Sequence, residues 1–188
     1  KRFNYKKKND QEIFEHSHNF MQLMLNRRSI RDFSSKVVPD KVIENILKTA
    51  ISSPSGANKQ PWSFVVVKSK ALKKKIRIAA EQEEKKFYKQ RATDEWLDDL
   101  NKFGTSWEKP FLEEAPALII IFRQSYDNSG SKKRKNYYVN ESVGIASGVL
   151  LTDLHLSGLA TLTHTPSPMG FLGDILDRPK NESAYLLI

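Results

Sequence analysis

Helical and extended patterns of apolar residues alternate along the whole chain, which predicts one domain of mixed secondary structure. Apolar residues recur at helical spacing in residues 18–26, and a longer helix opens at Pro39-Asp40 with one apolar face. Residues 71–91 and 93–102 are charged on one side, and we expect helices there too. Between the first two helices, the chain reads as a loop that enters a short extended piece.

Four segments carry the composition of strands. Residues 62–67 are β-branched and aromatic, and residues 117–122 form a continuous apolar run typical of the middle of a sheet. Residues 160–165 and 184–188 are predicted as further strands. The predicted fold class is therefore α+β, with a central mixed sheet flanked by helices.

Residues 138–156 predict a long helix that is rich in small residues and ends near Gly158. Small residues allow two helices to approach closely. The partner helix could belong to the same chain or lie across a two-fold axis, and the sequence leaves both alternatives open.

Length and composition place the chain among globular proteins. It has 188 residues, 39% of them hydrophobic, which is enough for one substantial core. Its longest apolar run is far below the roughly 20 residues of a membrane helix, and no signal-peptide pattern opens the chain. We expect a cytoplasmic protein or a soluble fragment with no membrane segment. Because the first residue is not Met, an upstream anchor stays an open alternative.

The residue counts also limit the chemistry. The absence of cysteine excludes disulfides, thiolate nucleophiles and sulfur-rich metal sites. The four histidines show no metal-ligand spacing beyond His16-x-His18, which we interpret as two solvated side chains. No metal site is predicted.

Positive charge exceeds negative charge by nine, and much of it lies in three clusters at residues 6–8, 68–77 and 132–135. A basic surface can bind nucleic acid in a salt-dependent way or steer anionic ligands towards a site. No nucleic-acid-binding motif links the clusters, so no nucleic-acid partner is predicted. A solvated surface is the favoured interpretation of each cluster taken separately.

Two short motifs carry candidate chemistry. Arg27-Arg28-Ser29-Ile30-Arg31 brings together guanidinium groups, whose rigid forks suit phosphate and carbonyl oxygens. Pro54-Ser55-Gly56-Ala57 lies in a turn between a helix and a buried strand, where backbone amides and a hydroxyl can converge on a ligand. Each motif alone is also typical of a solvated helix end or a plain turn.

Together, the segments RRSIRDF and VIENILKTAISSPSGANKQPWSFVVV resemble the FMN-binding half of nitroreductase-superfamily proteins, and within that superfamily they are most similar to the iodotyrosine deiodinase family. The resemblance runs from about residue 26 to the end of the chain. It implies a lead-in and helix at residues 1–25 and a single nitroreductase-like domain at 26–188, with a lid at about 80–110. It further implies a homodimer with a long interface helix. Members of the family continue past the position of Ile188 to a basic residue that contacts FMN.

The resemblance assigns the flavin contacts. It implies that the first motif holds the phosphate, the ribityl chain and the pyrimidine oxygens, and that Ser55 of the second motif contributes from the partner subunit. Thr165 would donate a hydrogen bond to flavin N5, which favours one-electron steps over hydride transfer. The implied cofactor-binding residues are Arg27, Arg28, Ser29, Arg31, Pro54, Ser55, Gly56, Thr163, His164 and Thr165.

The resemblance also assigns a substrate clamp. Glu84 would pair with the ammonium of an amino acid, Lys109 with its carboxylate, and Tyr88 would cover its ring. The backbone amide of Ala57 would meet the phenolate, which makes Ala57 and Thr165 the implied catalytic residues. Independently of the resemblance, Glu84 and Tyr88 are four residues apart and share a helix face. The competing interpretation places Glu84 on a solvated acidic face at residues 81–84.

The implied function is an FMN-dependent reductive dehalogenase that removes iodide, and other halides, from halotyrosines. NAD(P)H would be the ultimate electron donor, with a separate reductase as a possible partner. One alternative is a general FMN-dependent nitroreductase or quinone reductase, which would need no clamp for a zwitterion. An alternative of another class is a basic nucleic-acid-binding protein.

Overall fold

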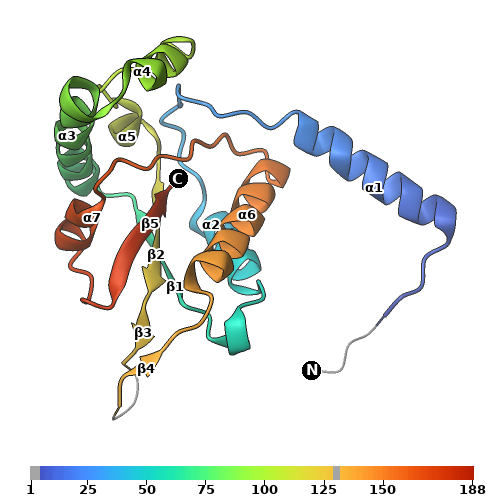
Figure 1. The fold of residues 1–188 in the computed structure, drawn as a ribbon. Coiled ribbons are helices and arrows are strands. Elements are labelled where there is room, and N and C mark those ends of the chain that lie inside the picture. The colour runs from blue at the N-terminus through green and yellow to red at the C-terminus, as the bar shows by residue number, and fades with distance from the viewer. Residues whose placement is uncertain (1–4, 129–131) are drawn as a thin grey trace.

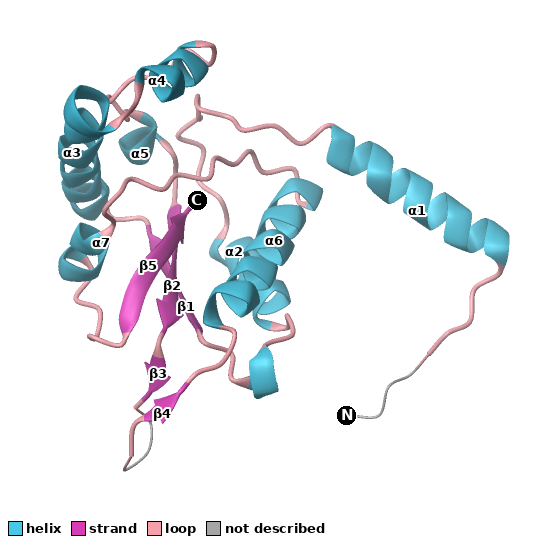
Figure 2. Cartoon of the chain, viewed as in Figure 1, coloured by secondary structure: helices cyan, strands magenta, loops and turns pink. Residues whose placement is uncertain are grey.

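A three-stranded sheet lies at the centre of the molecule (Figures 1 and 2). The computed structural model describes residues 5–128 and 132–188. The strands β1 (Trp62–Val67), β2 (Leu118–Gln124) and β5 (Glu182–Leu187) pair in the order β1-β2-β5, and both ladders are antiparallel. Strand β2 is central, as the continuous apolar run at 117–122 predicted.

The side chains of β2 alternate between two cores. Ile120 and Phe122 pack on one face of the sheet, Ile119 and Ile121 pack on the other, and all four are at most 5% exposed. Successive side chains of a strand point to opposite faces, so a strand buried on both sides must be apolar at every position. Helices cover both faces, which gives three layers.

One helical layer consists of α2 (Asp40–Ile51) and α6 (Val139–Leu156), and the opposite layer of α3 (Lys70–Lys86), α5 (Phe111–Glu114) and α7 (Gly170–Ile175) (Figure 1). Helices α2, α3 and α6 confirm three predicted helices, whereas the short α5 and α7 were not predicted. The predicted end of the long helix is also confirmed, because Gly158 has φ of +74°, which glycine adopts without strain.

Shorter elements fill the connections. Helix α3 continues into the π-helical turn η2 (Phe87–Arg91), and α4 (Asp94–Asn101) follows with Thr93 as its N-cap. The 3₁₀ turn η1 (Gly56–Asn58) precedes β1, and the two-residue strands β3 (Tyr126–Asp127) and β4 (Arg134–Lys135) form a hairpin below the sheet (Figure 1).

Helix α1 (Asp10–Leu25) projects away from the rest of the molecule as an arm (Figure 1). It begins earlier than residue 18, where the apolar spacing predicted it, because Asn9 and Glu12 form a capping box with two bonds of 2.9 Å. No residue of α1 is buried. At its inner end, the carbonyl of Leu23 lies 2.9 Å from Nε2 of His155 on α6.

Two of the sequence predictions differ from the structure. Residues 160–165, predicted as a strand, form only isolated bridges, from Thr161 to Ser29 and from His164 to Leu187. Pro166 follows directly and has no N–H to continue a ladder. The parallel component of the expected mixed sheet is the single Ser29–Thr161 bridge.

The basic cluster at 68–77 was expected to be solvated, but its residue Lys73 is buried. The Nζ of Lys73 donates to the carbonyls of Glu113 and Ala115.

No helix in the described ranges is long and apolar enough to cross a membrane.

A buried carboxylate ties the three strands together. Glu182 at the start of β5 accepts hydrogen bonds from Ser63 of β1 (2.6 Å), Gln124 of β2 (3.2 Å) and Arg178 (2.7 Å). Its side chain is 3% exposed. Burial alone would raise the pKa of Glu182, but the bonds from Arg178, Ser63 and Gln124 outweigh burial and lower it.

Glu182→Gln should therefore lower the free energy of unfolding by about 1.5–3 kcal/mol at pH 7, because hydrogen bonds to a charged group are lost. A lowered pKa in the folded state gives stability that is present above the unfolded pKa and is lost as the pH falls through the folded pKa. The difference between wild type and variant should thus shrink below about pH 4. Urea denaturation at several pH values checks this. The exposed Glu44→Gln serves as the control, and an equal loss in both variants would contradict the role of Glu182.

Candidate functional site

A cavity of about 760 Å³ opens between the C-terminal end of α3, the segment that carries α4, and residues 162–169. The predicted site residues Arg31, Glu84, Tyr88, Lys109, Thr163, His164 and Thr165 all line it. The structure thus brings together seven side chains from four separate parts of the chain. Hydrophobic walls come from Phe87, Trp96, Leu100, Phe111 and Met169.

The three predicted clamp residues are in mutual contact. Nζ of Lys109 lies 3.2 Å from Oε2 of Glu84, and it lies 5.7 Å from the centre of the Tyr88 ring. The two charged side chains are only 8% and 13% exposed. A buried ion pair repays its desolvation only with good geometry and further hydrogen bonds. Glu84 is therefore part of a built polar group and does not lie on a solvated acidic face.

Thr105 and Ser106 complete this polar group, and the sequence analysis missed both. The hydroxyl of Tyr88 lies 3.1 Å from Oγ1 of Thr105, and Nζ of Lys109 donates to the carbonyl of Ser106. Their only signal in the sequence was the break at Gly104, which marks a loop between two helical patterns. These contacts fix the orientations of the tyrosine and the lysine.

The segment at 163–165 alternates between solvent and core. Thr163 and Thr165 are exposed on the cavity side, whereas His164 is buried and bridges backbone to backbone with Leu187. An extended segment sends alternate side chains to opposite faces. The N–H of Ile30 donates to the carbonyl of Thr161 (3.0 Å), which holds the first arginine motif beside this segment.

The histidine between the two threonines is held neutral. Burial lowers the pKa of His164 to about 3, and the nearby ammonium of Lys109 adds to this effect. Its ring packs edge-on against Phe111, with the two ring centres 5.7 Å apart, and among the described residues Nε2 has no hydrogen-bond partner. A neutral imidazole with an unpaired nitrogen thus lies directly behind the cavity wall.

The arginines of the first motif lie in different surroundings. Arg31 lines the cavity, and its guanidinium lies 6.0 Å from the centre of the Phe103 ring. Arg28 instead donates to the carbonyls of Leu25 and Arg27 at the end of α1. Arg27 is half-buried and, like Arg28 and Ser29, does not line the cavity.

The second motif lies elsewhere in the protomer. The N–H of Gly56 donates to Oγ of Ser142 (3.2 Å) near the start of α6, whereas Thr161 follows the end of that helix (Figure 1). Ser142 and Leu156 are about 20 Å apart at the usual helical rise. Pro54, Ser55, Gly56 and Ala57 are therefore not brought to the cavity within one chain. Ala57 itself adopts a left-handed conformation, with φ of +49°.

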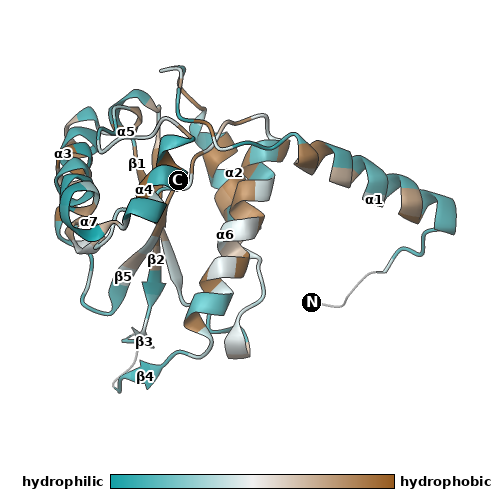
Figure 3. Cartoon of the chain, turned by 45° about the horizontal axis from the view of Figure 1, so that its top comes forward, coloured by the Kyte–Doolittle hydropathy of each residue, from teal (hydrophilic) through white to brown (hydrophobic). Residues whose placement is uncertain are grey.

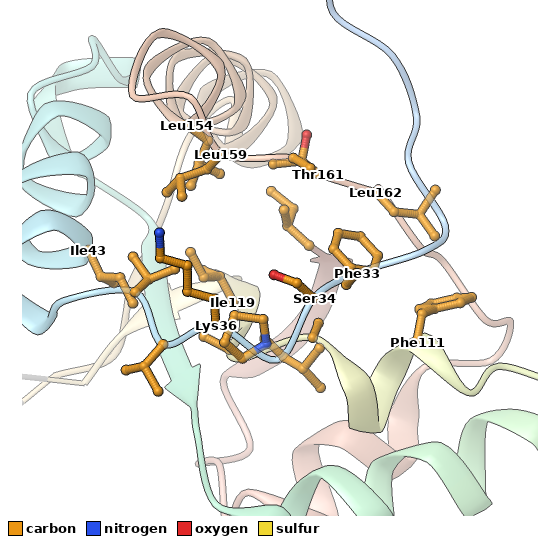
Figure 4. A pocket seen from close by; sticks show the side chains of 18 of the residues that line it. Phe33, Ser34, Lys36, Ile43, Phe111, Ile119, Leu154, Leu159, Thr161 and Leu162 are labelled. Atoms are coloured by element: carbon orange, nitrogen blue, oxygen red, sulfur yellow. The ribbon is translucent and has the colours of Figure 1, made fainter.

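A second cavity, of about 510 Å³, lies on the other side of Phe111 and Leu162 (Figure 4). Its walls are mainly apolar, as Ile43, Ile119 and Leu154 show in the close view. None of the predicted site residues lines it. The chemistry therefore favours the first cavity as the functional site.

The first cavity suits a flavin phosphate compound. Its size falls in the range of about 300–1,000 Å³ that is typical of ligand pockets. Arg31, Thr163 and Thr165 provide a guanidinium and two hydroxyls, which suit carbonyl and phosphate oxygens. The residues present thus fit FMN.

In the described part of the chain, no three His, Asp or Glu side chains form a group able to hold a metal ion.

Comparison with known proteins gives the family. Residues 24–177 match the Nitroreductase family. The chain is 55% identical over 179 residues to the iodotyrosine deiodinase of Haliscomenobacter hydrossis, an alignment that covers 95% of this chain and 81% of that protein. It is 42% identical over 181 residues to the iodotyrosine deiodinase 1 of Homo sapiens, of which it spans 63%.

Solved structures agree with this assignment. The crystal structure of oxidized iodotyrosine deiodinase bound to FMN and 3-iodo-L-tyrosine has a TM-score of 0.80 and 31% identity, and the match covers 89% of this chain and 86% of that one. A BluB-like flavoprotein from Clostridium difficile 630, at 20% identity and a TM-score of 0.68, shares the fold, with 89% and 86% of the chains covered.

The neutral His164 predicts a specific loss of stability in acid. Its folded pKa of about 3 lies below the ordinary 6.5, so the unfolded chain takes up this proton first. Stability should fall as the pH drops from about 6.5 towards 3, by up to roughly 1.4 kcal/mol per pH unit.

His164→Leu should remove this contribution. Urea denaturation between pH 7 and pH 4 should show a shallower decline in the variant than in wild type. Parallel pH profiles for the two proteins would show that His164 is not held neutral.

Proposed function

This chain belongs to the nitroreductase family, and from that premise we propose that it is an FMN-dependent reductase that removes iodide, and other halides, from halotyrosines. The observation that carries the proposal is the contact between Glu84, Tyr88 and Lys109 at one wall of the cavity. The chain spans 81% of its bacterial relative and 61–66% of several animal relatives, all of them iodotyrosine deiodinases.

The clamp suits an amino-acid zwitterion. Glu84 can exchange its lysine partner for the substrate ammonium, while Lys109 takes the substrate carboxylate, so both buried charges stay paired. Tyr88 then covers the phenol ring, with its hydroxyl held near Thr105. A general nitroreductase acting on neutral nitroarenes or quinones has no use for two buried opposite charges, which is why we favour the dehalogenase.

FMN, when bound and reduced, supplies the two electrons that, with one proton, convert the carbon–iodine bond into carbon–hydrogen and iodide. In our proposal Arg27, Arg28, Ser29 and Arg31 hold its phosphate, ribityl and pyrimidine groups, and Thr163, His164 and Thr165 pass beside its ring. Thr165 donates to N5, and the backbone amide of Ala57 donates to the phenolate oxygen. NAD(P)H, through a separate reductase, is the proposed source of electrons.

We propose a homodimer in which each site takes residues from both subunits. Pro54, Ser55 and Gly56 lie at the far end of α6 from Thr163 and Thr165. A second subunit is therefore needed to bring both groups of residues around one flavin.

Helix α1 also supports a homodimer. Figure 3 shows apolar positions along the arm. Five of its large apolar side chains are 46–61% exposed: Ile13, Phe14, Phe20, Met21 and Leu25. Residues 80–110 act as the lid over the bound substrate.

A shared site can be tested by mixing two defective subunits. Arg31→Ala and Ser55→Glu should each lose most FMN as homodimers, because a guanidinium is removed in one and a repelling carboxylate is added in the other. A heterodimer of the two variants contains one site with both defects and one site with none. It should therefore retain about half the flavin of wild type in an absorbance assay.

Lys133→Ala, on the β3–β4 hairpin, is the control and should keep its full FMN content. A heterodimer without flavin, or a monomeric wild type that binds FMN, would refute the shared site.

The clamp separates the dehalogenase from the general reductase. Glu84→Gln and Lys109→Ala should each weaken iodotyrosine binding by about 1.5–3 kcal/mol, roughly tenfold to a hundredfold, because a charge-assisted contact is lost. Iodophenol, which lacks the zwitterion, should bind wild type poorly and respond little to either change. Titration followed by flavin fluorescence measures both ligands.

The exposed Glu95→Gln is a suitable control for this experiment. Glu83→Gln is not, because Glu83 pairs with Lys86 (2.7 Å) and Arg91 (3.2 Å) and so supports the turn η2. Equal responses of iodotyrosine and iodophenol to the clamp variants would favour the general nitroreductase.

A further inference from the structure

Helix α3 carries a polar stripe that faces the segment leading into α5. Arg77, Glu81 and Glu84 follow one another at intervals of four and three residues, so they share one face of the helix. Lys73, one turn earlier, donates to the carbonyls of Glu113 and Ala115 at the end of α5. The stripe thus runs from a structural contact at one end to the clamp at the other.

Glu81 is the member of this stripe that holds the backbone of the clamp lysine. Its Oε1 accepts the backbone N–H of Lys109 at 2.7 Å. The same oxygen accepts a hydrogen bond from Nε of Arg77, also at 2.7 Å, and Nη1 of Arg77 donates to Oε1 of Glu113 at 3.3 Å. The hydrogen bond to Glu81, followed by the charges of Glu81 and Glu113, raises the pKa of Arg77, so the guanidinium stays charged.

Lys109 is consequently attached to α3 at both ends. Its backbone N–H binds Glu81, and its Nζ pairs with Glu84 one turn further along the same helix. The next residue, Pro110, has no N–H, so Lys109 supplies the one backbone donor at 109–110. The carbonyls of Lys109 and Pro110 accept bonds within the first turn of α5, so the bond to Glu81 is the contact that fixes this backbone relative to α3.

We propose that Glu81 is a positioning residue for substrate recognition. It holds the backbone of Lys109 in the position from which the ammonium of Lys109 contacts the substrate carboxylate. This inference rests on the proposed function, in which Lys109 binds that carboxylate. Glu81 is 16% exposed and does not line the cavity, so it acts through Lys109 and has no contact of its own with the ligand. Arg77 assists by holding the carboxylate of Glu81.

The test compares Glu81→Ala with Glu81→Gln in the FMN-loaded enzyme. Glu81→Ala should weaken iodotyrosine binding roughly tenfold, as expected for one lost bond to a charged acceptor. Iodophenol binding and FMN content should stay unchanged, and turnover at saturating iodotyrosine should stay close to wild type. Glu81→Gln keeps an oxygen that can accept the N–H of Lys109, so it should recover most of the affinity.

The matched control is Glu113→Gln, which removes the other carboxylate on Arg77 but has no bond to the Lys109 backbone. It should leave iodotyrosine binding within about twofold of wild type while lowering stability as much as an exposed ion pair does. A double-mutant cycle completes the test. In a Lys109→Ala background, Glu81→Ala should cause no further loss, because the residue it positions is gone.

The outcomes distinguish a failure of the proposed function from a failure of the positioning role of Glu81. If wild type does not discriminate iodotyrosine from iodophenol, the proposed function fails and the positioning role fails with it. If wild type discriminates but Glu81→Ala retains its affinity, or if the losses at 81 and 109 are additive, only the positioning role is overturned. If iodotyrosine and iodophenol weaken together in Glu81→Ala, the residue supports the fold of the lid and not the reach of Lys109.

Discussion

The fold depends on the burial of β2 on both of its faces. Ile119 and Ile121 supply one core, Ile120 and Phe122 the other, and each core needs its own helical layer to exclude water. The position of every functional element follows from this. Helix α3 lies in one layer and presents Glu84 of the proposed clamp, whereas α6 lies in the other, with Gly56 near its start and Thr161 beyond its end. A polar residue in the middle of β2 would disturb the core on the face to which its side chain points.

Local signals predicted much of this architecture. The continuous run at 117–122 could only be a buried segment, and β1, α2 and α6 carry clear periodicities. Residues 160–165 look like a strand by composition, but their backbone finds only isolated partners, at Thr161 and His164. Strand formation depends on an available edge, which no local pattern reports. The early start of α1 was missed because its first turns depend on a cap at Asn9 and not on apolar spacing.

The sequence predicted the clamp residues of the candidate site better than the contacts that support them. The spacing of Glu84 and Tyr88 placed them on one helix face, and the likeness to the family added Lys109, with which Glu84 forms a contact of 3.2 Å. The supporting contacts of Thr105, Ser106 and Glu81 are long-range or lie in a loop, so no sequence spacing encodes them. Nor could the sequence show that Gly56 packs against the start of α6, far from the cavity of its own chain.

The internal pairing of Glu84 with Lys109 compensates both of these buried charges before any ligand arrives. A simple carboxylic acid that bound Lys109 would leave the glutamate bare and desolvated, and a simple amine would do the same to the lysine. Such an uncompensated buried charge costs several kcal/mol. In the proposed function, the pair therefore disfavours singly charged ligands, because only a zwitterion keeps both buried charges paired.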